Sequence, residues 1–390
     1  MFRASSPPPP PFSALSSSGQ VTTLIQLSAD DARLGQRLAT AEKHGHQAGR
    51  LLSLYSLVRE ALALCETRLP EVLGSAGPAD ARAAALHLLS AGGKRIRPLL
   101  LALSARACQP AGAVKLAAAP LAALMVAAEL THAATLLHDD VLDVSEVRRG
   151  QETARMRWGN SVSVLAGDFV LIRALEEVQR SGIPGAMPAL LSTIHAMIAG
   201  EALQLSLRGR GDVRISDYHE VVAGKTAALF AFCGRAGALC AGAAAGAGAE
   251  PTTAVYADVL ANYARHLGQA FQIVDDVLDI DGDPAELGKA VLSDLREGKL
   301  TLPVLLALES RPELRERIQL AQLSLEDDSL PEPTVALLRS ALKASDATRR
   351  ARQQAATEAE SGCAGLDALP PGAYRDALWQ VADELVQRNR

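Results

Sequence analysis

The pentapeptide Asp-Asp-Val-Leu-Asp occurs twice in this sequence, and each copy could hold a divalent cation. The copies run from Asp139 to Asp143 and from Asp275 to Asp279, so the first and last aspartates of each share a helix face. Three carboxylates on one helical turn repel one another, whereas Mg²⁺ prefers oxygen ligands and commonly holds phosphate groups as well. The sequence therefore predicts a magnesium site between two helices, with the ligands Asp139, Asp140, Asp143, Asp275, Asp276 and Asp279.

Both copies end an apolar, helix-patterned segment, LTHAATLLHDD for the first and LGQAFQIVDD for the second. A single motif of this kind could be a solvated acidic helix end. Two identical copies in apolar surroundings favour a functional site instead. The sequence places no cluster of Cys or His beside the aspartates, so a zinc site is disfavoured.

Three basic clusters lie beside glycines and could bind anions. They occupy residues 93–98, 148–150 and 224–226, and Lys289 and Lys299 also follow glycines later in the chain. Glycine lets the backbone approach an anion closely, and arginine offers a bidentate fork to phosphate oxygens. The GKT tripeptide is not a P-loop, because the glycine required before it is absent. With the acidic motifs, these clusters indicate two diphosphate sites, one bridged by metal and one held by cations alone.

The composition favours a helical protein in a reducing compartment. The chain has 390 residues, of which 48% are hydrophobic and 3% aromatic, and its net charge is −5. That length suffices for one large core or two domains, and abundant alanine favours helices over sheets. The negative charge argues against nucleic-acid binding. Five scattered cysteines without a CxxC pair are typical of reduced thiols, so we expect a cytoplasmic protein.

We expect one all-α domain over residues 29–390, after a disordered Ser/Pro-rich leader at residues 1–28. Pro98 suits the first turn of a helix, and the run of small residues at 241–249 indicates a loop. The predicted helices cover residues 116–142, 161–180, 187–207, 216–240, 254–281, 301–309 and 374–387.

The sequence predicts no membrane span. The longest apolar run, 116–137, contains Pro120, Glu129 and His132, which favours a buried core helix. The N-terminal segment lacks the apolar region of a secretory signal.

Taken in order along the chain, these motifs resemble the trans-polyprenyl diphosphate synthase family, in particular its long-chain octaprenyl and solanesyl members. The resemblance implies a single-domain helical bundle around a large central cavity, acting as a homodimer. It also implies an enzyme that joins an allylic diphosphate head to tail with isopentenyl diphosphate. The matching segments are GGKRIRP (92–98), ELTHAATLLHDDVLD (129–143), RRG (148–150), WGNSVSVLAGDF (158–169), GEALQL (200–205), GKTAALF (224–230), GQAFQIVDDVLD (268–279) and LGKAVLSDLREGKLTLP (287–303).

The resemblance also assigns roles to single residues. The six aspartates would hold two or three Mg²⁺ ions, and Lys225 would join them in catalysis. The proline often found two residues after RRG in the family is Glu152 here. The implied contacts to the allylic diphosphate are Arg148, Lys225, Thr226, Gln272, Lys289 and Lys299, and those to isopentenyl diphosphate are Lys94, Arg97, His132 and Arg149.

Two small residues before the first motif bear on product length. In the family, the residues four and five places before the motif help form the floor of the product tunnel, and here they are Thr135 and Ala134. Ala134 lies about 7.5 Å along the helix from Asp139. Helical periodicity places Thr135 nearer the face of Asp139, so the role of Ala134 rests on the resemblance alone. Small residues at both places imply a long product, roughly C40–C50 in the family's long-chain members, of the kind that supplies quinone side chains.

Three alternatives remain open at this point. A short-chain farnesyl or geranylgeranyl diphosphate synthase would differ in its products. A class I terpene cyclase would need only one diphosphate site, and its second metal motif is normally of an Asn/Ser/Glu type. A non-catalytic subunit of a partner synthase could lose its aspartates, whereas this chain keeps all six.

Overall fold

The computed structural model describes residues 53–74, 77–110, 116–246, 250–283, 291–323 and 332–388. The predicted leader, the first part of the predicted domain and Lys289 lie outside these ranges. Within them the regular secondary structure is helical, apart from one short antiparallel hairpin formed by β1 (Val147–Arg148) and β2 (Gln151–Glu152). The prediction of an all-α fold is confirmed.

The first half of the described chain contains the helices α3 (Arg59–Gly74), α4 (Ala79–Ser90), α5 (Ile96–Ala107), α6 (Ala118–Leu142), α7 (Ala154–Trp158), α8 (Asn160–Ser181) and α9 (Ala186–Leu207). The second half contains α10 (Ile215–Val222), the π-helical turn η1 (Ala223–Ala227), α11 (Ala228–Ala245), α12 (Glu250–Asp281), α14 (Ser293–Arg296), α15 (Leu302–Ser310), α16 (Leu314–Leu323), α17 (Glu332–Ala344), α18 (Ala347–Cys363), η3 (Leu366–Ala368) and α19 (Ala373–Gln387).

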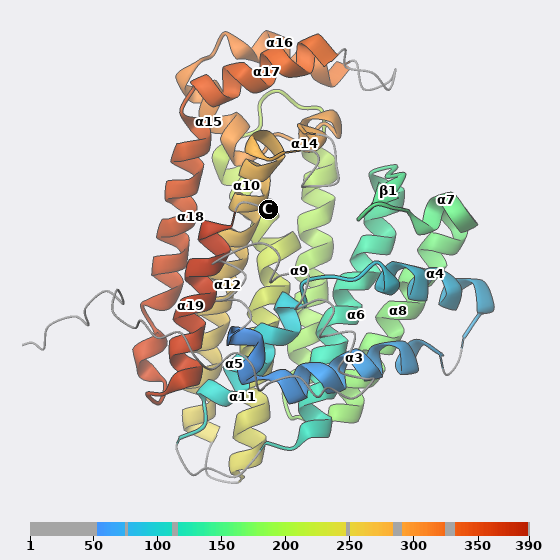
Figure 1. The fold of residues 1–390 in the computed structure, drawn as a ribbon, viewed down its shortest axis with the longest axis vertical. Coiled ribbons are helices and arrows are strands. Elements are labelled where there is room, and N and C mark those ends of the chain that lie inside the picture. The colour runs from blue at the N-terminus through green and yellow to red at the C-terminus, as the bar shows by residue number, and fades with distance from the viewer. Residues whose placement is uncertain are drawn as a thin grey trace, which may run out of the picture.

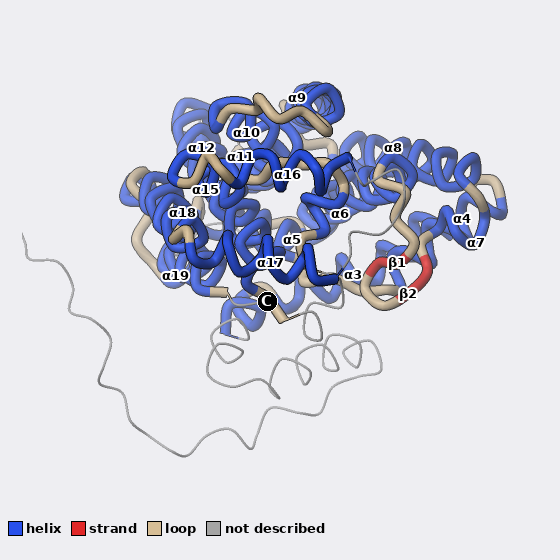
Figure 2. The backbone as a smooth tube through the Cα atoms, turned by 90° about the horizontal axis from the view of Figure 1, so that it is seen from above, coloured by secondary structure: helices blue, strands red, loops and turns tan. Residues whose placement is uncertain are grey.

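The long helices run side by side along the long axis of the molecule (Figure 1). The most extensive packing joins α6 to α8, α11 to α12, and α12 to α18. The hairpin follows α6 and α14 follows α12, and both lie toward the upper end in Figure 1. The two aspartate motifs, at the C-terminal ends of α6 and α12, are therefore carried to the same end of the bundle. Seen from above, the hairpin lies at the rim beside α4 and α7 (Figure 2).

In the part of the chain that the structure describes, three helical segments are long and apolar enough to cross a membrane by length and composition, but the burial of their residues differs. In the most apolar window of α6, 78% of residues are buried, as expected for the predicted core helix. The window in Ile215–Ala245 is 61% buried. The window in α9 is only 28% buried, so this helix leaves an apolar face uncovered in the single chain.

Two local predictions can be compared directly with the backbone. Pro98 lies in the first turn of α5, where its missing N–H is not needed, as predicted. The predicted loop at 241–249 is wrong for its first half, because α11 continues to Ala245 and ends at Gly246 with a φ of 82°. Alanine is the best helix former, so a run of alanines extends the helix until a glycine allows it to end.

Glycines on α11 allow three helices to approach one another closely. A Cβ added at Gly234 would lie 2.1 Å from the Leu260 carbonyl oxygen on α12. One added at Gly237 would lie 2.7 Å from the Leu101 carbonyl oxygen on α5. Backbone atoms cannot move aside as a flexible side chain can, so the position of α12 and its aspartates depends on Gly234, and the position of α5 depends on Gly237.

We expect Gly234→Ala to lower the free energy of unfolding by about 1–3 kcal/mol or more, because the added methyl group forces α11 away from α12. Urea denaturation monitored by circular dichroism measures this change. Gly74→Ala is the matched control, since nothing lies within 4 Å of the added Cβ and alanine favours the helix. Equal stability of the two variants would contradict the close-packing argument.

Candidate active site

A cavity of about 600 Å³ lies where α6, the hairpin, α9, η1, α12 and the segment after α14 meet. It brings together residues that are far apart in the sequence, including members of both aspartate motifs and of two basic clusters. The predicted site residues that line it are Asp139, Asp143, Arg148, Arg149, Lys225, Thr226, Gln272, Asp275, Asp276 and Lys299.

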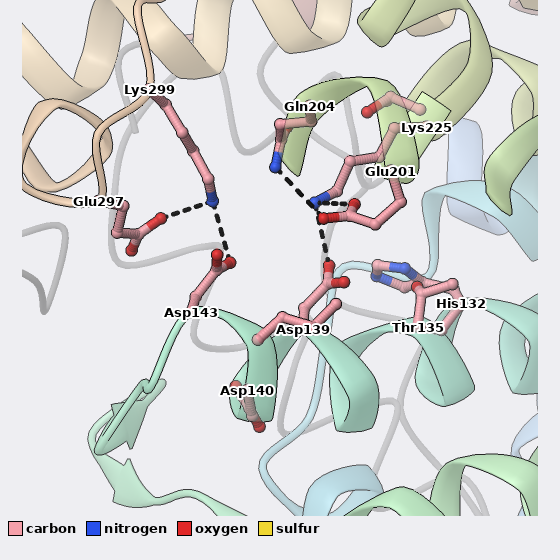
Figure 3. A network of polar contacts seen from close by, with 12 residues as sticks. His132, Thr135, Asp139, Asp140, Asp143, Glu201, Gln204, Lys225, Glu297 and Lys299 are labelled. Carbon is pink, nitrogen blue, oxygen red and sulfur yellow. Dashed lines mark hydrogen bonds and ion pairs between the residues drawn. The ribbon is translucent and has the colours of Figure 1, made fainter. Parts of the chain in front are cut away.

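The aspartates of the first motif lie on two opposite faces of α6 (Figure 3). Asp139 and Asp143 point into the cavity from one side of α6, as their four-residue spacing predicts, whereas Asp140 points the opposite way. Asp140 is fully buried and accepts a hydrogen bond of 2.7 Å from Arg148 Nε. Of the three predicted ligands in this motif, the structure therefore brings two together and places Asp140 where it anchors Arg148 of the hairpin.

Two lysines connect the cavity-facing aspartates to other acidic side chains. Lys225 Nζ lies 2.5 Å from Glu201 Oε2 and 3.5 Å from Asp139 Oδ2. Lys299 Nζ lies 2.6 Å from Glu297 Oε2 and 2.9 Å from Asp143 Oδ2 (Figure 3). Lys225 and Lys299, both predicted to bind a diphosphate, thus lie directly beside predicted metal ligands.

The three aspartates of the second motif lie in three different environments. Asp275 is half-exposed and lies 2.6 Å from Arg388 Nη2 near the C-terminus. Asp276 is buried and accepts hydrogen bonds from the Tyr218 hydroxyl at 2.6 Å and Gln272 Nε2 at 2.8 Å. Only these two aspartates of the motif line the cavity.

The third aspartate of this motif, Asp279, binds protein groups instead. It accepts hydrogen bonds from the Ser293 backbone N–H and hydroxyl and from the Asp294 backbone N–H. These contacts fix the first turn of α14, which precedes Lys299 in the chain. Asp279 therefore supports the site indirectly and does not line the cavity, so its predicted role as a metal ligand stays a prediction.

The π-helical turn η1 presents Lys225 and Thr226 to the cavity. Such turns are rare, and an extra residue in the helix turn changes the direction in which side chains point. Gly200 of α9 allows this turn to approach, because a Cβ there would lie 2.6 Å from the Lys225 backbone nitrogen. Thr226 Oγ1 donates a hydrogen bond of 2.9 Å to Gln272 Oε1, which links η1 to α12.

A second group of predicted residues, Arg97, His132 and Arg149, lies together beside this cavity, and Arg149 also lines the cavity itself. We call this group the cationic pocket. The guanidinium of Arg97 lies 5.1 Å from the centre of the Phe230 ring, and its buried Nε has no hydrogen-bond partner within the described part of the chain. Arg149 lies against Gly93, where an added Cβ would be 3.1 Å from Arg149 Nη1. Burial and the nearby positive charges of Arg97 and Arg149 hold the pKa of His132 well below its usual range. A pocket with this charge is suited to an anion.

The two predicted tunnel residues lie deeper along α6. Ala134 is 2% exposed and belongs to the core, whereas Thr135 is partly buried and its hydroxyl donates a hydrogen bond of 2.8 Å to the His132 carbonyl oxygen. Neither lines the cavity that holds the aspartates. Their predicted influence on product length stays a prediction.

Several residues of the site were missed by the sequence analysis. Glu201 and Glu297 bind the two lysines, Tyr218 binds Asp276, and Arg388 binds Asp275. Glu201 lies within the GEALQL segment and Glu297 within the segment 287–303, both already singled out, so both could have been proposed as lysine partners. Tyr218 and Arg388 come from other parts of the chain and carry no local signal.

The donor atoms fit a hard divalent cation. Among the described residues, no three His, Cys, Asp or Glu side chains converge closely enough to hold an ion by themselves. Mg²⁺ does not need such a cage, because it is commonly bound by one or two carboxylates together with waters and phosphate oxygens. Asp139, Asp143 and Asp275 offer carboxylates to one cavity, and Asp143 Oδ1 makes no hydrogen bond to any described residue.

Burial raises the pKa of Asp139 to about 6, although Lys225 opposes the shift. An aspartate in the unfolded chain has a lower pKa, about 3.9, so the folded protein binds the proton more tightly. Protonation of Asp139 therefore stabilises the folded state. This contribution to stability is complete below about pH 4 and is lost as the pH rises to about 6. Above that pH the ionised Asp139 is partly unneutralised, and a bound cation removes the cost.

The stabilisation by Mg²⁺ should therefore be larger at about pH 8 than at about pH 5, because only the ionised carboxylate binds the cation strongly. Thermal unfolding with and without Mg²⁺ at both pH values measures the effect as a shift in Tm. Asp139→Asn should reduce the shift at high pH. An equal shift at both pH values in the unmodified protein would contradict the prediction.

Comparison with known proteins agrees with these features. A family model described as polyprenyl synthetase matches residues 79–330. The octaprenyl diphosphate synthase of Escherichia coli (strain K12) is 39% identical over 305 residues, which cover 78% of this chain and 88% of that protein. The nonaprenyl diphosphate synthase of Mycobacterium tuberculosis is 37% identical over 307 residues, covering 78% and 85%.

A relative named for shorter prenyl products is also similar to this protein, and so are solved structures. A short chain isoprenyl diphosphate synthase of Methanothermobacter thermautotrophicus is 33% identical over 345 residues, covering 87% of this chain and 99% of that protein. A crystal structure of polyprenyl synthase from Caulobacter crescentus CB15, complexed with calcium and isoprenyl diphosphate, matches with a TM-score of 0.78 and 33% identity. The match covers 87% of this chain and 98% of that one.

Proposed function

Because the chain belongs to the polyprenyl synthetase family, we propose that it condenses an allylic diphosphate with isopentenyl diphosphate, head to tail, to a long-chain trans-polyprenyl diphosphate. The observation that carries this proposal is the presence of two differently charged sites beside each other. One is the cavity lined by Asp139, Asp143 and Asp275 with two lysines, and the other is the group of cations beside it, where Arg97 is buried and Arg149 reaches the cavity wall. A product of this kind can serve as the precursor of a quinone side chain.

The acidic site suits the allylic diphosphate, whose carbon–oxygen bond must break. A bound divalent cation supplies the charge neutralisation that makes diphosphate a good leaving group. Lys225 and Lys299 already lie among the carboxylates, so their ammonium groups are positioned to stabilise negative charge that develops on phosphate oxygens. We propose Mg²⁺, two or three ions for each site, because the donors are carboxylate oxygens.

The cationic pocket suits the second diphosphate. Arg97 and Arg149 can give it charge-assisted hydrogen bonds, and His132, held neutral, can donate a further one without adding charge. The double bond of isopentenyl diphosphate then attacks the allylic cation, and a proton is lost to the departing diphosphate. We assign no protein side chain as the general base.

Two alternatives are less well supported. A terpene cyclase needs a single diphosphate site and leaves the pocket around Arg97 without a role. A non-catalytic subunit would not need the pairing of Lys225 with Asp139 and of Lys299 with Asp143. We further propose a cytoplasmic location, supported by five free cysteines that are all buried.

The purified chain, given isopentenyl diphosphate and a C15 allylic diphosphate, is expected to form prenyl diphosphates longer than C30, and EDTA should stop the reaction. Chromatography of the dephosphorylated products measures their length. Products formed without isopentenyl diphosphate would indicate a cyclase, and full turnover in excess EDTA would exclude the metal-dependent mechanism.

Ala134→Tyr should shorten the main product to about C15–C20, because a ring one to two turns below Asp139 would block the growing chain. Ala134 is almost fully buried, so circular dichroism must first establish that the variant is folded. Thr135→Tyr tests the partly buried neighbour in the same way. If both folded variants make the wild-type product, the floor of the tunnel lies elsewhere.

We also propose a homodimer, joined through an apolar stripe on α8 and α9. The stripe is defined by exposed side chains seven residues apart on each helix, a spacing that keeps them on one face. A second copy would present the same stripe, so a two-fold arrangement can bury both. Its members, with their exposed fractions, are Leu165 (59%) and Ile172 (54%) on α8, and Leu191 (52%), Ile198 (65%) and Leu205 (40%) on α9.

Ile198→Glu should convert the dimer to a monomer, since it places a charge in the apolar contact. Light scattering coupled to size-exclusion chromatography measures the mass. Leu337→Glu is the matched control, because Leu337 on α17 is also 65% exposed but lies outside the stripe. A monomeric wild-type protein, or a dimer that survives Ile198→Glu, would overturn the proposed interface.

A further inference from the structure

A buried ionic network lies directly behind the cationic pocket. Arg95, which stands between Lys94 and Arg97 in the sequence, is 8% exposed and points into the protein. Its Nε donates a hydrogen bond of 2.7 Å to Glu66 on α3, and its Nη1 donates one of 2.6 Å to Glu129 on α6. One guanidinium therefore joins the start of α5 to two other helices.

The backbone at Arg95 is unusual in the same place. Its φ of 49° and ψ of 37° lie in the left-handed region, which a long side chain rarely adopts. Such a conformation persists only where surrounding contacts enforce it. The two carboxylates supply these contacts through the side chain, and the Tyr55 hydroxyl supplies another by donating to the Lys94 carbonyl oxygen. The turn that leads into α5 is thus held on both sides.

The network also lies close to the residues expected to bind the second diphosphate. A Cβ on Gly93 would be 3.2 Å from Arg95 Nη1 and 3.1 Å from Arg149 Nη1, so both guanidinium groups flank this glycine. Arg97 follows two residues later, in the first turn of α5. Together, Arg95, Glu66 and Glu129 carry a net charge of −1, which partly offsets the positive charge of Arg97 and Arg149.

We infer that Arg95, Glu66 and Glu129 are positioning residues that fix the turn at residues 92–97 and thereby set the affinity for isopentenyl diphosphate without touching it. This inference rests on the proposed function. Stability alone is a poor reason for such a network, because buried ion pairs are often no better than apolar residues of the same size. Glu66 and Tyr55 precede the residues that the family model matches, so this support comes from outside the matched domain.

The test is Glu129→Gln in the full-length chain, which keeps the shape of the side chain and removes its charge. We expect KM for isopentenyl diphosphate to rise roughly tenfold or more, since a charge-assisted hydrogen bond that holds the turn is weakened. KM for the allylic substrate should stay within about twofold of wild type, because the carboxylates and lysines of that site are unchanged. Glu66→Gln, at a partly exposed carboxylate, is a milder variant that should act in the same direction.

Glu177→Gln is the matched control. Glu177 is also a fully buried carboxylate bound to an arginine of α3, with Arg68 Nη2 2.6 Å away, and it pairs with Arg180 as well. It joins α3 to α8 and makes no contact with the turn at residues 92–97. A loss of Tm without a change in either KM is expected for this variant.

Arg95→Lys adds a second comparison, because lysine keeps the charge but cannot bridge both carboxylates with a planar fork. It should raise KM for isopentenyl diphosphate as Glu129→Gln does. The inference is overturned if the network variants resemble Glu177→Gln, or if they raise KM for both substrates equally. Failure of the proposed function is a separate outcome, in which the unmodified protein forms no prenyl diphosphate.

Discussion

The structure depends on how charged side chains that lose water in a partly buried cavity are balanced before substrate binds. A carboxylate or ammonium group that loses water needs a partner. The structure meets this need by alternating signs, with Lys225 between Asp139 and Glu201, and Lys299 between Asp143 and Glu297. Groups expected to bind metal and groups expected to bind phosphate therefore partly neutralise one another in the single chain. When a diphosphate and its cation bind, the lysines exchange a carboxylate partner for phosphate oxygens and the cation takes over the carboxylate.

Such alternation demands that helices from distant parts of the sequence meet within a few ångströms. Small residues make these approaches possible. Gly200 admits the π-helical turn that carries Lys225, and Gly234 admits α12, which carries Asp275 and Asp276. The low aromatic content and abundant alanine serve the same end, because short side chains let helix axes lie close together. The composition seen in the sequence is thus connected to the geometry of the charges.

Helical periodicity predicted correctly which aspartates of the first motif face the cavity. It failed where an aspartate forms hydrogen bonds to another part of the chain. Asp139 and Asp143 share a cavity face, as the four-residue spacing requires, and Asp140 lies away from them for the same reason. In the second motif the same spacing is misleading, because Asp279 accepts hydrogen bonds from Ser293 and Asp294. Free backbone N–H groups at the start of α14 attract a carboxylate, and a pattern within α12 cannot reveal them. Arg388 was missed on similar grounds, since its contact with Asp275 depends on how the C-terminal helix folds back.

The two sites differ in what they hold before substrate binds. The carboxylates Asp139 and Asp143 each share a lysine with a glutamate, so these four carboxylates and two lysines keep a net charge of −2 that a divalent cation can offset. In the cationic pocket, Arg97 keeps a buried Nε without a partner among the described residues, and burial lowers its pKa while Glu129 opposes that shift. An unsatisfied buried donor raises the free energy of the unliganded state, and an anion that accepts its hydrogen bond recovers that free energy. The same carboxylate that supports the charge of Arg97 also holds Arg95. One buried glutamate therefore connects the electrostatics of the pocket to the shape of its turn.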